Sequence, residues 1–244
     1  MASLHETGHA RNVAHFQTLI EFVKSYSNAY NPSKPSLQLP ALQELKASAD
    51  STLQEVLAKN TIYNTKINER LNAFINLKSL STRLINAIQA TDATPGIIND
   101  AKAYNRKIQG KKAKTPKATD TSDKETAKTI STSQQSYDQQ IQHLVGLKNV
   151  LEAEPSYSPN EDDLKITTLN RKIIDLQEKN TAVATAYTAV STSRIKRNQT
   201  LYTGENGIFE TAKDVKKYIK SVFGATSPQF LQVKGLPFKK PRLS

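Results

Sequence analysis

Three histidines near the start of the chain have the spacing of a zinc site. His5-Glu6-Thr7-Gly8-His9 fits the H-E-x-x-H pattern, which on a helix places two imidazoles one turn apart beside a glutamate that can act as general base. His15 stands where the extended pattern has a third ligand, although Asn12 replaces its glycine. Gly8 weakens a helix at this point. We therefore interpret the motif as a polar helix start; a metalloprotease and adventitious metal binding are the alternatives.

The rest of the sequence contains no second constellation with catalytic spacing. The chain has no cysteine, so disulfides, thiolate ligands and cysteine nucleophiles are excluded. We expect His143 at a solvated or boundary position on a helix, and we interpret Asp162 and Asp163 as a helix N-terminus. No Gly-rich phosphate loop and no G-x-S-x-G motif occurs. The sequence predicts no enzyme, no cofactor, no metal and no catalytic residue.

The positive charge is concentrated in two segments. The formal net charge is +12, yet residues 102–117 carry seven Lys or Arg and no acid, and residues 213–244 carry eight with one acid. Such segments attract polyanions or acidic partner surfaces through long-range fields. The predicted contact residues for a polyanion or a partner are Arg106, Lys107, Lys111, Lys112, Lys114, Lys216, Lys217, Lys220, Lys239, Lys240 and Arg242.

The kind of polyanion is not specified by any known recognition module. The sequence has no zinc finger, no RNP motif and no convincing helix-turn-helix, so nucleic acid would be bound through phosphates, without sequence preference and in a salt-sensitive manner. A basic amphipathic helix over residues 213–223 that lies on a membrane surface is a further alternative. No apolar run approaches the ~20 residues of a membrane span, so we predict none.

The elements that would position these residues are helices, because apolar residues recur at steps of three and four almost throughout. The second helix would be about 80 Å long, since neither proline nor glycine interrupts it. We expect Gly224 to cap the last helix and residues 225–244 to be largely irregular. The expected helices cover residues 8–30, 40–92, 97–109, 123–153, 160–200 and 208–223.

Two halves of the chain resemble each other. Pro32-x4-Leu37-x-Leu39-x2-Leu42 matches Pro159-x4-Leu164-x-Ile166-x2-Leu169 at an offset of 127, and residues 84–92 parallel 219–227 at an offset of 135. Residues 166–197 also carry a heptad seam, which includes Tyr187 and has Arg194 as a polar interruption. Two helical hairpins with apolar faces must bury those faces together. We therefore predict an all-α fold: an elongated, antiparallel, coiled-coil-like four-helix bundle made of two duplicated helical hairpins with extra short helices.

This organisation predicts consecutive domains. They are a first helical repeat unit over 1–109, a basic flexible linker over 110–122, a second helical repeat unit over 123–224, and a basic, proline-containing tail over 225–244.

Five motifs, distributed over most of the chain, resemble a family of uncharacterised all-helical proteins from Bacteroidetes-type bacteria. They are His9-Ala-Arg-Asn-Val13, Tyr30-Asn-Pro-Ser-Lys34, Ala90-Thr-Asp-Ala-Thr94, Asn105-Arg-Lys-Ile-Gln-Gly-Lys111 and Tyr218-Ile-Lys-Ser-Val-Phe-Gly-Ala-Thr-Ser-Pro228. The resemblance implies a bacterial, cytoplasmic protein. It implies no activity and no site residues.

Together these features favour a non-enzymatic structural protein that associates with itself, in filaments or lattices. Apolar helix stripes left uncovered are self-association sites, and a molecule with two different ends can stack head to tail. The alternative function is a nonspecific nucleic-acid-associated protein that uses the basic linker and tail.

Overall fold

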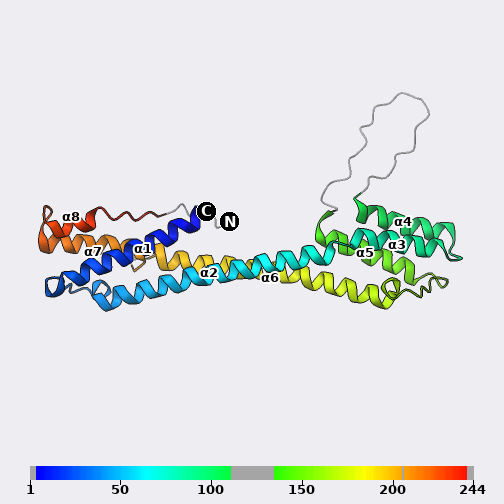
Figure 1. Cartoon of the computed structure of the whole chain (residues 1–244), viewed down its shortest axis with the longest axis horizontal. Helices are drawn as coiled ribbons and strands as arrows, with labels where there is room; N and C mark the ends of the chain where they lie inside the picture. The colour runs from blue at the N-terminus through cyan, green and yellow to red at the C-terminus, as the bar shows by residue number, and fades with distance from the viewer. Residues whose placement is uncertain (1–3, 111–134, 205, 241–244) are drawn as a thin grey trace, which may run out of the picture. The chain divides into compact units, whose positions relative to one another are not determined.

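The computed structural model of this chain describes residues 4–110, 135–204 and 206–240. These residues form α-helices joined by short turns and 3-10 segments, without any strand in the described ranges (Figure 1). The predicted all-α class is confirmed. The expected linker lies outside the described residues apart from Gly110, as do residues 123–134 of the third expected helix. None of the described helices has the length and apolar character needed to cross a membrane.

The chain forms two compact units that interleave along the sequence. Unit 1 comprises residues 1–63 and 186–244, and unit 2 comprises residues 64–185. Two helices cross the boundary, α2 (Leu39–Phe74) and α6 (Ile166–Tyr202), so each contributes to both units. The units therefore differ from the consecutive division expected from the sequence, because segments from both ends of the chain share one core.

Unit 1 has a core to which α8 (Pro228–Lys234) and four longer helices contribute fully buried side chains. Phe16 on α1 (Leu4–Ser25), Leu42 on α2, Leu201 on α6 and Val215 on α7 (Ile208–Phe223) belong to one cluster. The expected last helix and its glycine cap are confirmed, since the N–H of Gly224 donates to the carbonyl of Lys220 with φ at +93°.

Part of the tail is helical, contrary to the prediction of a largely irregular segment. Helix α8 runs over Pro228–Lys234, with Ser227 accepting a hydrogen bond from the N–H of Phe230 at its start. Val233 is fully buried in the core of unit 1. The helix forms because Ser-Pro is a good N-terminal cap sequence and Val233 has an apolar surface to cover.

Unit 2 is built in the same way from the middle of the chain. Its fully buried side chains include Leu84 on α3 (Leu77–Gln89), Ile108 on α4 (Pro95–Gln109), Leu147 on α5 (Tyr137–Glu152) and Leu169 on α6. His143 on α5 is buried as well, so the prediction of a solvated or boundary position is wrong. It is buried because α5 packs into the unit 2 core over more of its surface than the apolar stripe alone indicates.

The expected continuous helix over 40–92 is interrupted, because α2 ends at Phe74 and α3 begins at Leu77. No proline or glycine marks the break. Ile75 is 74% exposed, whereas Phe74 and Leu77 on either side are buried. Lys172 on α6 donates to the carbonyl of Ala73 at 2.8 Å, which satisfies a carbonyl left open at the helix end. This tertiary hydrogen bond explains why a local sequence pattern does not predict the break.

The same turn precedes both long helices. In unit 1 the hydroxyl of buried Tyr30 donates to the carbonyl of Leu37 at 2.8 Å, and in unit 2 Tyr157 donates to Leu164 at 2.9 Å. Each turn ends in a 3-10 segment, η2 (Pro35–Leu37) or η4 (Asp162–Leu164). The acids expected to start the fourth helix therefore lie in η4, and α6 itself begins at Ile166.

Helices α4 and α5 pack closely where α5 has a glycine. A Cβ atom added at Gly146 would overlap the ring of Tyr104 on α4. In α1, by contrast, Gly8 has open space around it. The two glycines thus form a matched pair for testing this packing.

We predict that Gly146→Ala lowers the free energy of unfolding by about 1–2 kcal/mol, because overpacking outweighs the gain of about 1 kcal/mol in helix propensity. Gly8→Ala should leave the stability unchanged or raise it slightly. Urea denaturation of both variants measures the difference. Equal effects of the two substitutions would contradict the close α4–α5 packing.

Candidate interaction sites

The N-terminal histidine motif takes part in the packing of unit 1. His9 is buried, and its Nδ1 lies 2.7 Å from the hydroxyl of Tyr202 on α6. The Nδ2 of Asn12 donates to the same hydroxyl at 3.0 Å. The side chains of His5 and Glu6 lie outside the described part, and within that part no group of three or more His, Asp or Glu is placed to hold a metal.

Asn12 also contacts the far end of the chain. Its Nδ2 donates to the carbonyl of Lys239 at 2.7 Å, and its Oδ1 accepts from the N–H of Lys239 at 3.1 Å. One turn along α1, the Nδ1 of His15 donates to the carbonyl of Pro237 at 2.6 Å. We name residues 236–240 the C-terminal strap. Two side chains of α1 therefore form the first part of its binding site on unit 1.

Helix α7 completes the site of the C-terminal strap. Lys216 donates from Nζ to the carbonyl of Leu236 at 2.6 Å, and Nζ lies 5.1 Å from the centroid of the Phe238 ring. The ring of Phe238 meets that of His15 edge-on, at 6.1 Å between centroids. Burial lowers the pKa of Lys216, because desolvation disfavours the charged form. Lys216, predicted as a polyanion contact, is thus used within the fold.

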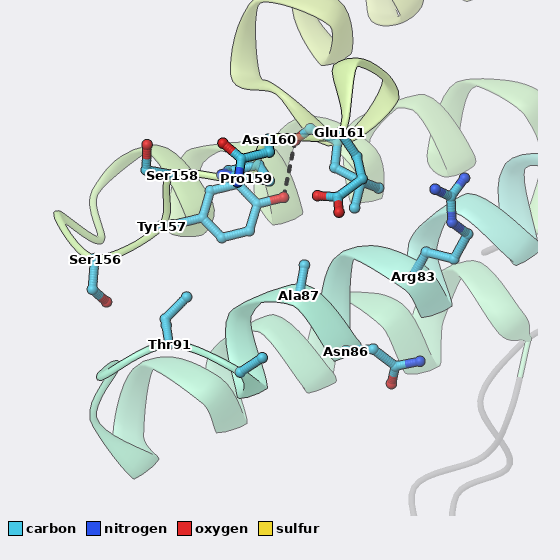
Figure 2. Close-up of a pocket in the computed structure, with 12 residues that line it drawn as sticks. Arg83, Asn86, Ala87, Thr91, Ser156, Tyr157, Ser158, Pro159, Asn160 and Glu161 are labelled. Carbon is cyan, nitrogen blue, oxygen red and sulfur yellow. Dashed lines mark hydrogen bonds between the residues drawn. The ribbon is translucent and has the colours of Figure 1, made fainter.

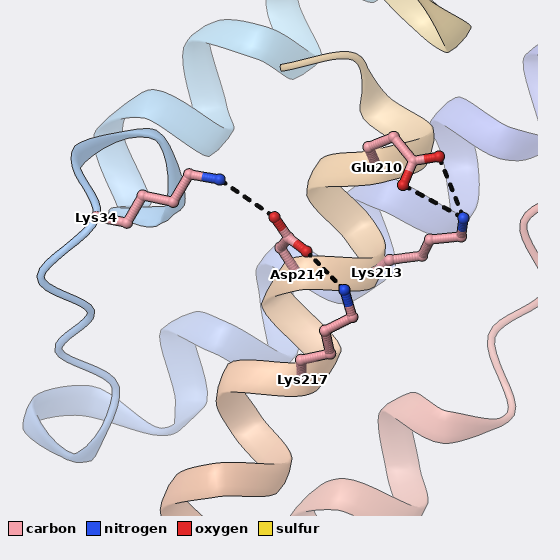
Figure 3. A network of polar contacts seen from close by, with 5 residues as sticks. All are labelled: Lys34, Glu210, Lys213, Asp214 and Lys217. Carbon is pink, nitrogen blue, oxygen red and sulfur yellow. Dashed lines mark hydrogen bonds and ion pairs between the residues drawn. The ribbon is translucent and has the colours of Figure 1, made fainter. Parts of the chain in front are cut away.

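The other predicted lysines of unit 1 have exposed side chains, and one of them, Lys217, is also paired with an acid. Lys217 pairs with Asp214 at 3.1 Å, and Lys34 reaches the same carboxylate at 3.2 Å (Figure 3). The hydrogen bond from Lys217, followed by that from Lys34, lowers the pKa of Asp214. Lys220 is exposed, with Nζ 5.9 Å from the centroid of the Phe230 ring. Asp214 therefore reduces the positive charge that α7 offers to a partner.

The remaining predicted contact residues lie on the strap, on α4 or outside the described residues. The side chains of Lys239 and Lys240 on the strap are exposed. Arg106 and Lys107 are exposed at the end of α4, where the carbonyl of Lys107 accepts from Gln135 at 2.7 Å. The structure brings Lys216 and Lys239 together at one site in unit 1 and places Arg106 and Lys107 in unit 2. The residues outside the described ranges are Lys111, Lys112, Lys114 and Arg242.

Unit 2 has a polar pocket that the sequence did not indicate. It has a volume of about 550 Å³ and lies between α3 and the turn that precedes α6 (Figure 2). Arg83 at its edge forms a two-bond ion pair with Asp163. Tyr157 lines the pocket, although its hydroxyl is used by the carbonyl of Leu164. The lining contains neither histidine nor cysteine, and the pocket offers room for a small polar ligand.

No protein-family model, no curated protein and no solved structure matches the chain. The family resemblance of the sequence motifs therefore stays a prediction.

We predict that Tyr157 makes stability fall at high pH. Burial, with smaller contributions from the charges of Glu161 and Asp163, raises its pKa to about 12. A raised pKa in the folded state stabilises the fold fully below pH ~10, and this contribution is lost as the pH rises through about 12. Thermal unfolding between pH 8 and 12 should show the loss in the parent chain and a smaller loss in Tyr157→Phe.

The control for this experiment is Tyr187→Phe, which changes an exposed tyrosine in unit 1. It should have the pH profile of the parent chain. Identical profiles for all three proteins would contradict the buried position of the Tyr157 hydroxyl.

Proposed function

We propose that this chain is a non-enzymatic structural protein that associates with copies of itself through the sides of α2 and α6. One observation carries the proposal: the exposed apolar side chains are concentrated on these two helices. Nine large apolar side chains are exposed in the described part of the chain, and seven of them lie on α2, on α6 or in the turn that ends α2. Those seven are Leu57, Ile62, Leu71, Ile75, Ile174, Tyr187 and Ile195.

The contacts between α2 and α6 in unit 1 support this surface. Tyr187, expected in the buried heptad seam, is 58% exposed and contacts Tyr63 at 5.8 Å between ring centroids. Arg194, a second seam position, is exposed and donates to Asn60 at 3.4 Å. The seam is therefore partly open to solvent here. Single exposed apolar residues are ordinary on a monomer, but a concentration of them on two helices is typical of an interface.

We further propose that the two halves of the chain arose by duplication of a helical hairpin, as the sequence predicts. The supporting contacts are the equivalent turns at Tyr30 and Tyr157, which are 127 positions apart. Helices α4 and α8 also begin alike, with Thr94-Pro95 and Ser227-Pro228 as cap sequences. These caps are 133 positions apart, which favours a smaller insertion in the second half than an offset of 135 requires.

The proposed location is the bacterial cytoplasm. It rests on the resemblance of the sequence motifs and on the lack of cysteine, which suits a reducing compartment.

We predict that the double variant Leu57→Ser/Ile195→Ser associates about a hundredfold more weakly than the parent chain. Each substitution removes about 1–2 kcal/mol of apolar burial between copies, or about tenfold in affinity. Sedimentation velocity over a concentration series measures the effect. Circular dichroism should show an unchanged helix content, because both side chains are exposed.

The matched control is Val222→Ser/Leu231→Ser, which removes two exposed apolar side chains from α7 and α8. It should associate like the parent chain. An equal loss in both double variants would argue against α2 and α6 as the contact surface.

A second function, nonspecific binding of nucleic acid, is favoured by the exposed lysines of unit 1. Lys217, Lys220, Lys239 and Lys240 are all exposed on α7 and the C-terminal strap. Binding through phosphates weakens steeply with salt, whereas apolar association does not.

We therefore predict large species without excess absorbance at 260 nm, at both low and high salt, in size-exclusion chromatography with light scattering. The chain has no tryptophan, so bound nucleic acid would be evident in the ratio of absorbances at 260 and 280 nm. A 260 nm excess that disappears at high salt would favour nucleic acid. A monomer at both salts would contradict both functions.

A further inference from the structure

The C-terminal strap is held mainly by hydrogen bonds to its main chain. Asn12 binds the N–H and the carbonyl of Lys239, His15 binds the carbonyl of Pro237, and Lys216 binds that of Leu236. Four hydrogen bonds thus join three side chains of α1 and α7 to a short extended segment. Recognition of this kind depends on the path of the backbone and not on which molecule supplies it.

One contact outside the strap also holds Asn12 in place. Asn12 is only 4% exposed, and one of its two Nδ2 hydrogens is used by the hydroxyl of buried Tyr202. The other Nδ2 hydrogen and Oδ1 are left to match the carbonyl and N–H of one strap residue. Rotating the side-chain amide of Asn12 by 180° would place its Oδ1 against the carbonyl of Lys239. The pairing therefore also determines the direction in which a segment is bound.

The strap is suited to leave its own site and enter another. Only Gly235 separates α8, which Val233 anchors in the core, from Leu236 at the start of the strap. Leu236 and Phe238 are half-buried, and the side chains of the other three strap residues are exposed. Proline at 237 and at 241 restricts the residue before each to extended conformations, which lowers the entropy cost of binding.

We propose that the C-terminal strap is exchanged between copies, so that residues 236–240 of one molecule occupy the α1–α7 site of another. This inference rests on the proposed function. Association through α2 and α6 holds copies together, which raises the effective concentration of a strap at a neighbour's site. The exchanged contacts are identical to those made within one chain, so exchange costs little beyond the movement at Gly235.

The test uses two full-length variants. Lys239→Pro removes the N–H that Asn12 accepts and leaves the site intact, which makes an acceptor chain. Asn12→Leu removes the site and leaves the strap intact, which makes a donor chain. Lys239→Ala is the matched control for the acceptor, since it removes the same charge and keeps the N–H.

We expect each of the two variants alone to associate about tenfold more weakly than the parent chain, because each lacks at least one main-chain hydrogen bond. An equimolar mixture, with the two chains carrying different fluorophores, should form hetero-complexes that are tighter than the complexes of either variant alone, because the intact strap of one chain meets the intact site of the other. Lys239→Ala should associate like the parent chain. The measurement is two-colour sedimentation velocity, with circular dichroism as the check on folding of Asn12→Leu.

A mixture that associates no better than its components would overturn the exchange. Equal behaviour of Lys239→Pro and Lys239→Ala would overturn it as well, without depending on the Asn12 variant. In both cases the parent chain would still associate and respond to Leu57→Ser/Ile195→Ser, so the proposed function would stand. A parent chain that does not associate would overturn the function and the exchange together.

Discussion

A tyrosine hydroxyl that donates to a main-chain carbonyl seven residues later determines how the chain enters both long helices. The carbonyls of Leu37 and Leu164 belong to buried residues, and a buried carbonyl without a partner costs about 1–3 kcal/mol. The hydroxyl satisfies that carbonyl and closes the turn, so the leucine points into the core where the long helix begins. The position of the apolar face of α2 or α6 in its unit follows from this turn. The other helices of the unit then cover that face.

Helix type could be predicted from the sequence, because spacing of three and four residues determines an amphipathic face locally. Helix ends that depend on partners far away in the sequence could not be predicted in this way. The break after Phe74 is stabilised by Lys172, which lies 99 positions from the carbonyl that it satisfies. The site of the C-terminal strap is harder still to predict, since Asn12 and Lys239 are 227 positions apart and no sequence pattern links them. The start of α8, in contrast, had a local signal in Ser227-Pro228 that the count of prolines in the tail obscured.

Clustered charge indicated where the chain is basic, but not how each lysine is used. Lys172 and Lys216 each donate to a main-chain carbonyl, and neither hydrogen bond involves an acidic partner. A long side chain with three donors can reach a carbonyl at a helix end or in an extended segment while its methylenes pack on apolar surface. The lowered pKa of Lys216 reflects this use, because burial disfavours its charge. Net charge therefore overstates the charge available to a polyanion wherever lysines serve the fold.

Apolar contact and main-chain hydrogen bonding would contribute differently to the assembly that we propose. Burial of leucine and isoleucine from α2 and α6 is non-directional, so it can hold copies together in more than one alignment. The pairing of Asn12 with the N–H and carbonyl of a single residue is directional and admits one position of the bound segment. A few hydrogen bonds on a short strap would be too weak to join free molecules at low concentration. Added to an apolar contact that already brings copies close, they would select one alignment, and an assembly with a repeating geometry requires that selection.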